Sequence, residues 1–404
     1  MARKWWVAAP VAALLIGASA CSSSSSSGSS GTSAASEIVV TVMGTFQAAG
    51  ADYEDAAAAI QASADEVNAA GGIHGHKLKI IVCDDQENPN QAETCARQAV
   101  SDNSAVVLSP TESTGFGAQT LPVLAAAGIP DVDEPAVVPT DWTSSNVFPL
   151  DPGEPAQYAA VALALKQHGC TKVGSLQLPV ASGAAAAGDL GTALTKIGGS
   201  LVLNVKTGMS EPTYAPQVAQ LISAGAQCVV PIILPTEISK LISAINQSGK
   251  KLPIGGVTAA FNQQLLTSLG TSADGIILAG GNYLPTDTTI PSVEAMITAM
   301  KKYTPGTPPT DTYGTSAWGA ATLVFSSVMP AITGPITASS VMKALDATKN
   351  ATVGTYAPYT FAQPAPNSQF PRLRNSGILT WVVTNDVPKL TSSGFINIYQ
   401  ALQG

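Results

Sequence analysis

The sequence is poor in charged side chains and in histidine, and each shortage excludes a class of function. Charged residues make up 11% of the 404 residues and the formal net charge is −8; average soluble proteins are roughly 25% charged. A chain this acidic offers no basic stripe to neutralise phosphates, so we expect no nucleic-acid partner. With three histidines a histidine-rich metal enzyme is disfavoured, and we expect no metal and no cofactor.

The N-terminus lacks a hydrophobic run long enough to cross a membrane. Arg3 and Lys4 precede an apolar stretch, residues 7–20, that is interrupted by Pro10 and ends in small residues. A membrane span needs about 20 apolar residues, whereas this pattern is typical of a cleaved secretory signal. We therefore assign residues 1–20 to a signal peptide.

Cys21 follows directly, and Ala18-Ser19-Ala20-Cys21 resembles a bacterial lipoprotein box, although the box usually has leucine where Ala18 stands. The resemblance implies that Cys21 carries lipid; simple secretion is the alternative. Residues 21–36 are nearly all Ser, Gly, Thr and Ala, a composition that buries no apolar area and predicts a flexible tether. We expect an exported chain, anchored by lipid to the outer face of the plasma membrane.

Four cysteines remain for disulfide bonds if Cys21 is acylated. Cys83 ends a strand-like run and Cys95 lies on the next predicted helix. Cys170 and Cys228 precede apolar strands by similar offsets, so neighbouring parallel strands would bring them within bridging distance. The sequence therefore predicts the pairs Cys83–Cys95 and Cys170–Cys228, with four free thiols as the alternative.

Short β-branched runs alternate with alanine-rich helical stretches over the rest of the chain. Strands are predicted at 38–42, 78–83, 105–108 and 129–132, separated by helices at 52–70, 90–102 and 117–127. A second series of alternating helices and strands follows Asp151-Pro152-Gly153. Helices are expected at 292–303, 313–332 and 338–347, and a strand at 378–383. This order predicts an α/β fold with two doubly wound lobes.

We place 37–153 with about 285–337 in the N-terminal lobe. The C-terminal lobe takes 154–284 with about 338–404. In such sheets ligands bind at the carboxyl ends of the strands, so two facing lobes predict a cleft at their common rim.

Three short motifs have a structural interpretation that competes with a chemical one. His74 and His76 form a histidine pair without a visible third ligand, on a turn. The glycine-rich stretch 183–191 lacks the Lys-Ser/Thr of a phosphate-binding loop. The stretch 314–318 nearly spells a hydrolase elbow around Ser316, but Trp318 replaces the last glycine and no histidine follows it. A secreted hydrolase is therefore the least favoured function.

The segment ADEVNAAGGIHGHKLKIIVCDDQENPN carries a specific set of residues. They are Asn68, Gly71, Gly72, Ile73, Gly75, Asp84, Asp85 and Pro89. The set resembles the type I solute-binding proteins of ABC importers, the branched-chain amino-acid-binding family, and the likeness extends over the mature chain. It implies two Rossmann-like lobes joined by a multi-strand hinge.

The resemblance also implies positions that contact a ligand. Tyr53 matches an early tyrosine of the family, and Ser113 and Thr114 match the hydroxyl turn after the third strand, where Ser113 would otherwise be a plain helix cap. The other implied positions are Pro135, Ala136, Ser182, Pro235 and Thr258, with Glu112 as the nearby acid.

Several of these positions depart from the amino-acid binders. Pro135-Ala136-Val137 lacks the usual threonine hydroxyl, and the acid that would hold an ammonium near Thr258 is missing. Burying an ammonium group without a carboxylate partner is costly. The sequence therefore predicts a less polar solute, such as a small carboxylate or an aromatic compound, as an alternative to an amino-acid-like one. Implied partners are this solute and membrane permease subunits, with the chain a monomer. The alternative is a lipoprotein that senses the solute for a membrane receptor.

Overall fold

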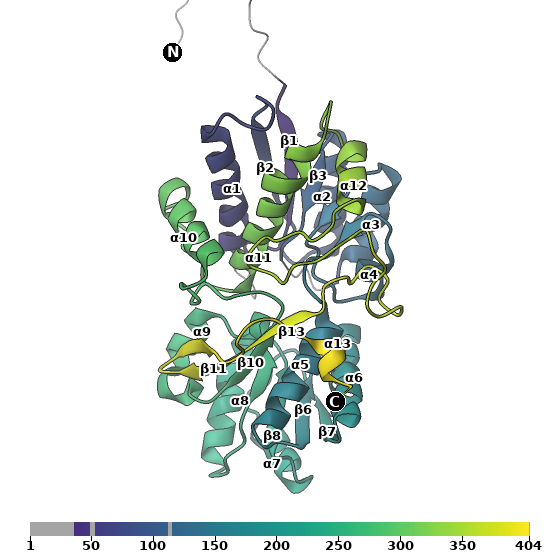
Figure 1. Ribbon diagram of the computed structural model, residues 1–404. Coiled ribbons are helices and arrows are strands. Elements are labelled where there is room, and N and C mark those ends of the chain that lie inside the picture. The colour runs from purple at the N-terminus through teal and green to yellow at the C-terminus, as the bar shows by residue number, and fades with distance from the viewer. Residues whose placement is uncertain (1–35, 49–52, 112–114, 404) are drawn as a thin grey trace, which may run out of the picture. The chain divides into compact units, whose positions relative to one another are not determined.

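The first lobe is built on a fully parallel sheet. The computed structural model describes residues 36–48, 53–111 and 115–403. The sheet has the strand order β2-β1-β3-β4-β5, in which β1 pairs with β2 on one side and with β3 on the other (Figure 1). Its strands are β1 (Ile38–Gly44), β2 (Leu78–Asp84), β3 (Val106–Leu108), β4 (Asp131–Val132) and β5 (Val147–Phe148).

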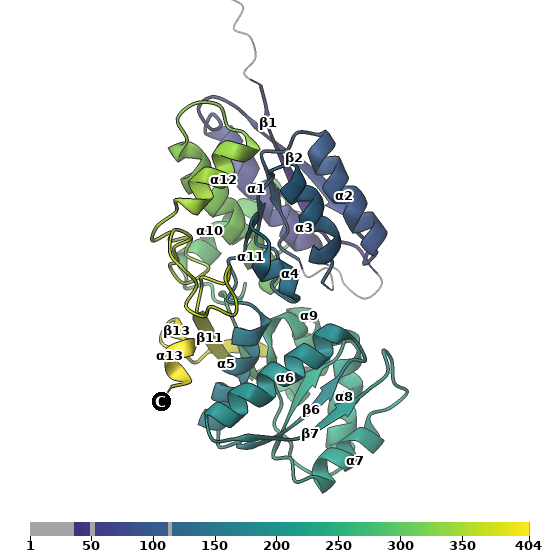
Figure 2. The same ribbon diagram turned by 90° about the vertical axis from the view of Figure 1, so that its right-hand side faces the viewer.

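Helices cover both faces of this sheet (Figure 2). They are α1 (Glu54–Ala69), α2 (Pro89–Ser101), α3 (Gly117–Ala126), α4 (Pro139–Thr143), α10 (Pro291–Tyr303), α11 (Thr312–Ala321) and α12 (Ala338–Asp346). Helix α1 buries Ala56, Ala59 and Ile60 in the larger core with α10 and α11, while α2 and α3 close a smaller core on the opposite face. Asn88 caps α2 by accepting from the N–H groups of Asn90 and Gln91. The alternating pattern thus forms the expected three layers.

The second lobe has a mixed sheet. Strands β7-β6-β8 form a parallel part. Strands β9-β10-β11-β12 form a second part, in which β9 and β10 are parallel, and a bridge between Val229 and Ile254 joins the two parts. Strands β11 and β12 run antiparallel to their neighbours. The strands are β6 (Lys172–Gln177), β7 (Ser200–Lys206), β8 (Cys228–Ile232), β9 (Gly255–Val257), β10 (Ile277–Gly280), β11 (Gly377–Thr384), β12 (Val387–Leu390) and β13 (Ile396–Asn397).

Two hydrophobic cores lie on opposite faces of this second sheet. One holds α5 and α6 with Ile398 of α13, and the other holds α7, α8 and α9 around the fully buried Trp381. The helices are α5 (Glu154–Gln167), α6 (Ala181–Lys196), α7 (Ala215–Ser223), α8 (Pro235–Gln247), α9 (Gln263–Leu269) and α13 (Ile398–Ala401), with short 3₁₀ turns at Thr258–Ala260 and Gly270–Ala273. No helix among the described residues is both long and apolar enough to span a bilayer.

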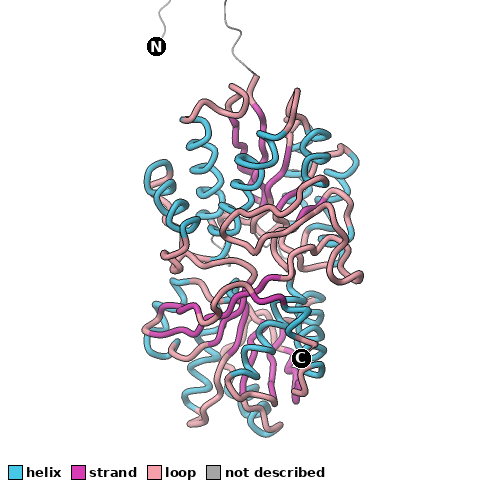
Figure 3. The backbone as a smooth tube through the Cα atoms, viewed as in Figure 1, coloured by secondary structure: helices cyan, strands magenta, loops and turns pink. Residues whose placement is uncertain are grey.

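Three chain segments connect the lobes and lie side by side (Figure 3). The first is residues 150–153, the second 280–282 and the third 375–377. Asn375 Nδ2 donates to the carbonyl of Leu150 at 2.8 Å. A Cβ on Gly281 would lie 2.2 Å from Asp151 Oδ2. The three segments therefore form the multi-strand hinge.

One predicted boundary between the lobes is wrong. Residues from about 338 were expected in the C-terminal lobe, but α12 buries Val341 and Leu345 in the core of the first lobe, together with Tyr356 and Phe361. The chain enters the second lobe only with β11, which pairs with β10. The reason is packing, because the first sheet needs these aromatic side chains to complete its larger core.

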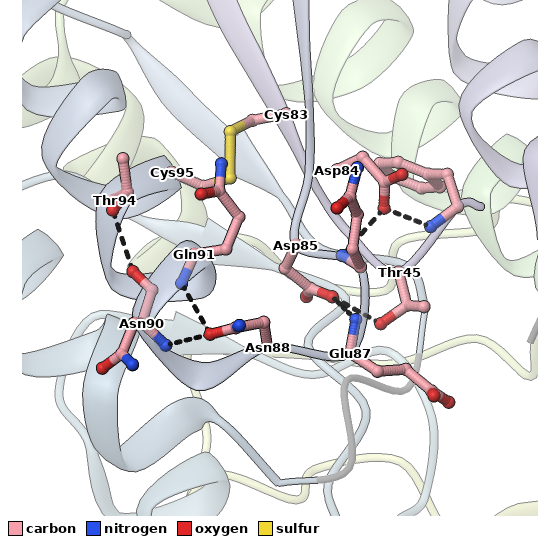
Figure 4. The surroundings of a disulfide bond; sticks show 12 residues. Thr45, Cys83, Asp84, Asp85, Glu87, Asn88, Asn90, Gln91, Thr94 and Cys95 are labelled. Carbon is pink, nitrogen blue, oxygen red and sulfur yellow. Dashed lines mark hydrogen bonds between the residues drawn. A yellow bond between two sulfur atoms is a disulfide. The ribbon is translucent and has the colours of Figure 1, made fainter. Parts of the chain in front are cut away.

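Both predicted disulfide pairs are present. Cys83–Cys95 joins the end of β2 to α2 with Cα atoms 5.6 Å apart (Figure 4). Cys170, two residues before β6, is bonded to Cys228, the first residue of the adjacent strand β8, at a Cα separation of 6.2 Å. Each bond thus links elements that the sheet topology already makes neighbours.

Candidate ligand-binding cleft

Two cavities lie between the lobes, at the carboxyl ends of the strands. The outer cavity has a volume of about 670 Å³ and the inner cavity about 60 Å³. The outer cavity is lined by Ala48, Tyr53, Glu54, Asp55, Pro235, Thr236, Asn262, Gln264, Leu265, Ser268, Gly306, Thr307, Pro308 and Thr310. The inner cavity is lined by Pro110, Asp133, Pro135, Ala136, Val137, Asp151, Glu154, Gln157, Val257, Thr258, Ala259, Asn282, Thr312, Tyr313, Ser316 and Tyr356. Both lobes contribute walls to both cavities.

Asp55 anchors the first-lobe wall of the outer cavity. It is 3% exposed, and its Oδ2 accepts from the N–H of Thr310 at 2.7 Å and of Asp311 at 3.3 Å. Its Oδ1 is buried and has no hydrogen-bond partner among the residues that the structure describes. Burial raises the pKa of Asp55 to about 6, although these N–H donors act to lower it. The start of α1 is thereby fixed against the start of α11, with a carboxylate at the cavity.

The inner cavity is built around a hydrogen-bonded triad of Asp133, Ser316 and Tyr356. Ser316 Oγ donates to Asp133 Oδ2 at 2.5 Å, and Tyr356 OH donates to Asp133 Oδ1 at 3.2 Å. Burial raises the pKa of Asp133 to about 8, with a further increase from the charge of Asp151. The carboxyl group of Asp133 is therefore largely protonated at neutral pH.

An aromatic pair stands where the two cavities approach each other. Tyr53 lines the outer cavity and Tyr313 the inner one, and their ring centroids are 4.5 Å apart with the rings tilted by 57°. Tyr53 comes directly before α1, and Tyr313 lies in the first turn of α11, whose N-cap is Asp311. The packing of α1 on α11 thus sets the position of both rings.

The turn after β4 has its amide groups engaged by the protein itself. Asp141 Oδ2 accepts from the N–H of Val137 at 3.0 Å and of Val138 at 2.8 Å. Here these two donors already have a carboxylate acceptor.

The acidic pair after β2 has a structural role. Thr45 Oγ1 donates to Asp85 Oδ1 at 2.6 Å, and the N–H of Phe46 donates to Asp84 Oδ1 at 3.0 Å (Figure 4). The same carboxylates accept from the N–H groups of Gln86 and Glu87. The pair therefore ties the end of β2 to Thr45 and Phe46, the first residues after β1.

The structure brings five of the predicted contact residues to the cleft. Tyr53 and Pro235 line the outer cavity, and Pro135, Ala136 and Thr258 line the inner one. Contact with a ligand stays a prediction for all five.

Ser182 lines neither cavity and lies in the first turn of α6. Glu112, Ser113 and Thr114 lie outside the described residues, as does Cys21.

Sequence reasoning missed the residues that carry most of the cleft's polar chemistry. Asp55, Asp133, Tyr313 and Tyr356 come from four separate parts of the chain. Ser316, which also lines the inner cavity, is the serine of the near-elbow motif in the sequence. It lies inside helix α11 and is bonded to an acid and a tyrosine, so it has neither the position nor the partner of an elbow serine.

The histidine pair belongs to a turn. His74 has a left-handed φ of 53°, and His76 Nδ1 lies 2.7 Å from the carbonyl oxygen of Ser36. Within residues 36–48, 53–111 and 115–403, no three His, Cys, Asp or Glu side chains are grouped to hold a metal ion.

Comparison with known proteins identifies the architecture. A family model described as periplasmic binding protein matches residues 37–372. No curated protein matches the chain.

Three solved structures illustrate the likeness. A branched-chain amino acid ABC transporter protein from Thermus thermophilus with bound valine has a TM-score of 0.76 at 17% identity, covering 91% of this chain and 98% of that one. A possible leucine/isoleucine/valine-binding protein from Rhodopirellula baltica also gives 0.76 at 17%, covering 89% and 97%. A fatty acid ABC transporter substrate-binding protein from Thermomonospora curvata gives 0.73 at 15%, covering 89% and 92%. At these identities the likeness concerns the fold.

Proposed function

The chain belongs to the periplasmic binding protein family, and we propose that it is the substrate-binding component of an ABC importer. It has the type I fold of that family, with two α/β lobes and a three-segment hinge. In this role it captures a small solute between the lobes and performs no chemistry on it.

The observation that carries the proposal is a cleft with walls from both lobes. Tyr53 and Asp55 of the first lobe face the same outer cavity as Pro235 and Asn262 of the second. A ligand closes a hinge only if it binds the closed form better, and a shift from 1:99 to 99:1 takes about 5.5 kcal/mol of differential affinity. Walls from both lobes supply contacts that exist only in the closed form.

We further propose that the chain is exported and attached to the membrane through lipid on Cys21. The signal-like residues 1–20 and the Ser-rich residues 21–36 support this arrangement. Its partners would be membrane permease subunits, which receive the closed and loaded form. The names of the similar structures associate several of them with ABC transporters.

The solute is small, because the outer cavity offers about 670 Å³. Amino-acid-like, aromatic and small carboxylate compounds all fit this volume. A bare carboxylate is the least favoured of these, since Asp141 already occupies the N–H groups of Val137 and Val138.

A thermal-shift screen of the full chain against these compound classes tests the proposal. A solute at 100 times its dissociation constant should stabilise the protein by about 2.7 kcal/mol. Tyr53→Ala should weaken the binding of any hit at least fivefold. Thr195→Ala, on the exposed face of α6 outside both cavities, should leave affinity unchanged. If both variants bind every hit like the parent chain, the cleft is not the binding site.

A further inference from the structure

The described walls of the cleft carry negative charge only. Glu54 and Asp55 line the outer cavity, and Asp151 and Glu154 line the inner one beside the largely protonated Asp133. No lysine, arginine or histidine is found among the described residues that line either cavity. Segments 49–52 and 112–114 contain no basic residue in their sequence either. A counter-charge for an anionic solute is therefore missing from the walls and from these neighbouring segments.

The carboxylate of Asp55 is strongly buried, with no cation beside it among the described residues. Asp55 is 3% exposed, and its Oδ1 has no hydrogen-bond partner in the described part of the chain. The largely protonated carboxyl group of Asp133 is 2% exposed and is held by the hydroxyl groups of Ser316 and Tyr356, so it supplies no counter-charge for an anion. A cleft with low-dielectric walls of one sign concentrates ions of the opposite sign and repels ions of its own sign. An anion entering this cleft would lose its hydration and meet only like charge.

Aromatic rings are a second feature of the cleft that favours a cationic solute. Tyr53 and Tyr313 form a tilted pair between the two cavities, and Tyr356 lines the inner one. Tyrosine rings attract organic cations through their negative faces, most strongly when the cation is partly desolvated. Carboxylates and aromatic rings together form the environment in which amines and quaternary ammonium groups are recognised.

We infer that the solute is a small organic cation, an amine or a quaternary ammonium compound, with its charged group against the Tyr53–Tyr313 pair and the cleft carboxylates. This inference rests on the proposed binding function. It also accounts for the engaged amides of Val137 and Val138, since such a solute needs no anion-binding turn.

Matched probes that differ only in charge test the inference. One set is choline with its neutral isostere 3,3-dimethylbutan-1-ol. Two further sets contain a cation, a neutral compound and an anion of similar shape. The first is benzylamine, benzyl alcohol and benzoate, and the second is isopentylamine, isopentanol and isovalerate. In titrations with the full chain, we expect a cation to bind at least tenfold tighter than its neutral isostere and the anions not to bind. A neutral or anionic member that binds as tightly as its cation overturns the inference.

A second measurement covers solutes outside these sets. The full chain is incubated with a small-molecule extract of rich growth medium and desalted, and the retained compounds are identified by mass spectrometry. A retained cation supports the inference. A retained anion or uncharged compound overturns it and leaves the binding function standing. If nothing is retained and no probe binds, the proposed function itself fails.

Variants connect the charge preference to the cleft. Glu154→Gln, in the first turn of α5, should weaken cation binding at least fivefold and leave neutral isosteres unaffected. Tyr53→Leu should weaken the cation more than Tyr53→Phe does. Glu294→Gln makes the same change in the first turn of α10, outside both cavities, and should have no effect. Equal affinities for Glu154→Gln, Tyr53→Leu and the control would overturn the assignment.

Discussion

At the scale of single residues, the approach of the two lobes depends on a glycine without space for a side chain. A Cβ on Gly281 would lie 2.2 Å from Asp151 Oδ2 and 2.3 Å from Pro152 Cδ, both in the neighbouring hinge segment. Gly281→Ala should therefore lower the free energy of unfolding by about 1–3 kcal/mol, because one of the segments must move. Urea denaturation measures this loss, and the affinity for the solute should change with it.

Gly188→Ala is the matched control. Gly188 lies inside α6, and a Cβ there would meet no atom within 4 Å. Removing a glycine from a helix interior should add about 0.5–1 kcal/mol of stability. A Gly281→Ala protein as stable as the parent chain would contradict the close hinge contact.

The buried Asp133 should make the free energy of unfolding decrease as the pH rises. Burial raises its pKa to about 8 in the folded chain, against an ordinary value of 3.8. The protonated carboxyl group contributes fully to the free energy of unfolding below about pH 4, the pKa of the unfolded chain. This contribution is lost as the pH rises to about 8, the pKa of the folded chain. Asp133→Asn should abolish this loss, so wild-type stability relative to Asp133→Asn should fall by up to about 1.4 kcal/mol per pH unit between pH 5 and 7. Parallel pH profiles for the two proteins in urea denaturation would exclude a protonated Asp133.

The sequence predicted some cleft residues that follow strands, but it missed Asp133, which also follows one, and it missed Asp55 and Tyr313 on helices. Pro135 and Thr258 follow strands, so their place at the rim was predictable from the alternating pattern. Asp55 and Tyr313 reach the cleft because α1 and α11 pack at a particular angle. Side-chain packing of this kind leaves no periodic signal in one sequence.

At the scale of elements, the disulfide bonds should stabilise the fold by shortening loops in the unfolded chain. Cys83 and Cys95 are separated by 12 residues, and Cys170 and Cys228 by 58. Loop-closure entropy then gives about 3 kcal/mol for the first bond and about 4 kcal/mol for the second. Replacing each pair by alanine and measuring urea denaturation should show losses of this order and rank, whereas unreduced peptide mapping with other pairings would contradict the assignment.

The alternation of strands and helices was predictable, but the C-terminal elements were less so. The predicted helix at 313–332 is three pieces: α11, a π-helical stretch at Thr322–Val328 and a 3₁₀ turn at Met329–Ala331. Helix-compatible residues specify helical backbone there, but not the hydrogen-bond spacing. The strands β12 and β13 are four and two residues long and pair only with β11. Such short edge strands are set by their partner, and their own residues carry little signal.

At the scale of the whole molecule, the N-terminus should determine where the protein resides in the cell. If Cys21 carries lipid, Cys21→Ser should move the chain from the membrane fraction to the soluble exported fraction, because the substitution removes the proposed lipid attachment. Immunoblots of fractionated cells measure this shift, with Ser24→Ala in the same Ser-rich stretch as a control that keeps Cys21. A chain that stays in the membrane fraction after Cys21→Ser would contradict lipid anchoring at this residue.

The two-lobe organisation was predictable from the order of helices and strands, but the position of the last chain crossing from the first lobe to the second was not. The first crossing, after Asp151, was visible as a Pro-Gly break. The last crossing comes near residue 375, because α12 and the aromatic residues after it pack against the first sheet. Both lobes accept an amphipathic helix equally well on pattern alone, so only the structure decides between them.

The central claim is that one solute is held by both lobes at once. A crystal structure of the full chain with its highest-affinity solute tests this most directly. We predict density for the solute between the lobes, in contact with Tyr53 or Asp55 on one side and with Pro235, Thr258 or Asn262 on the other. A solute bound to one lobe alone, away from these residues, would contradict the account.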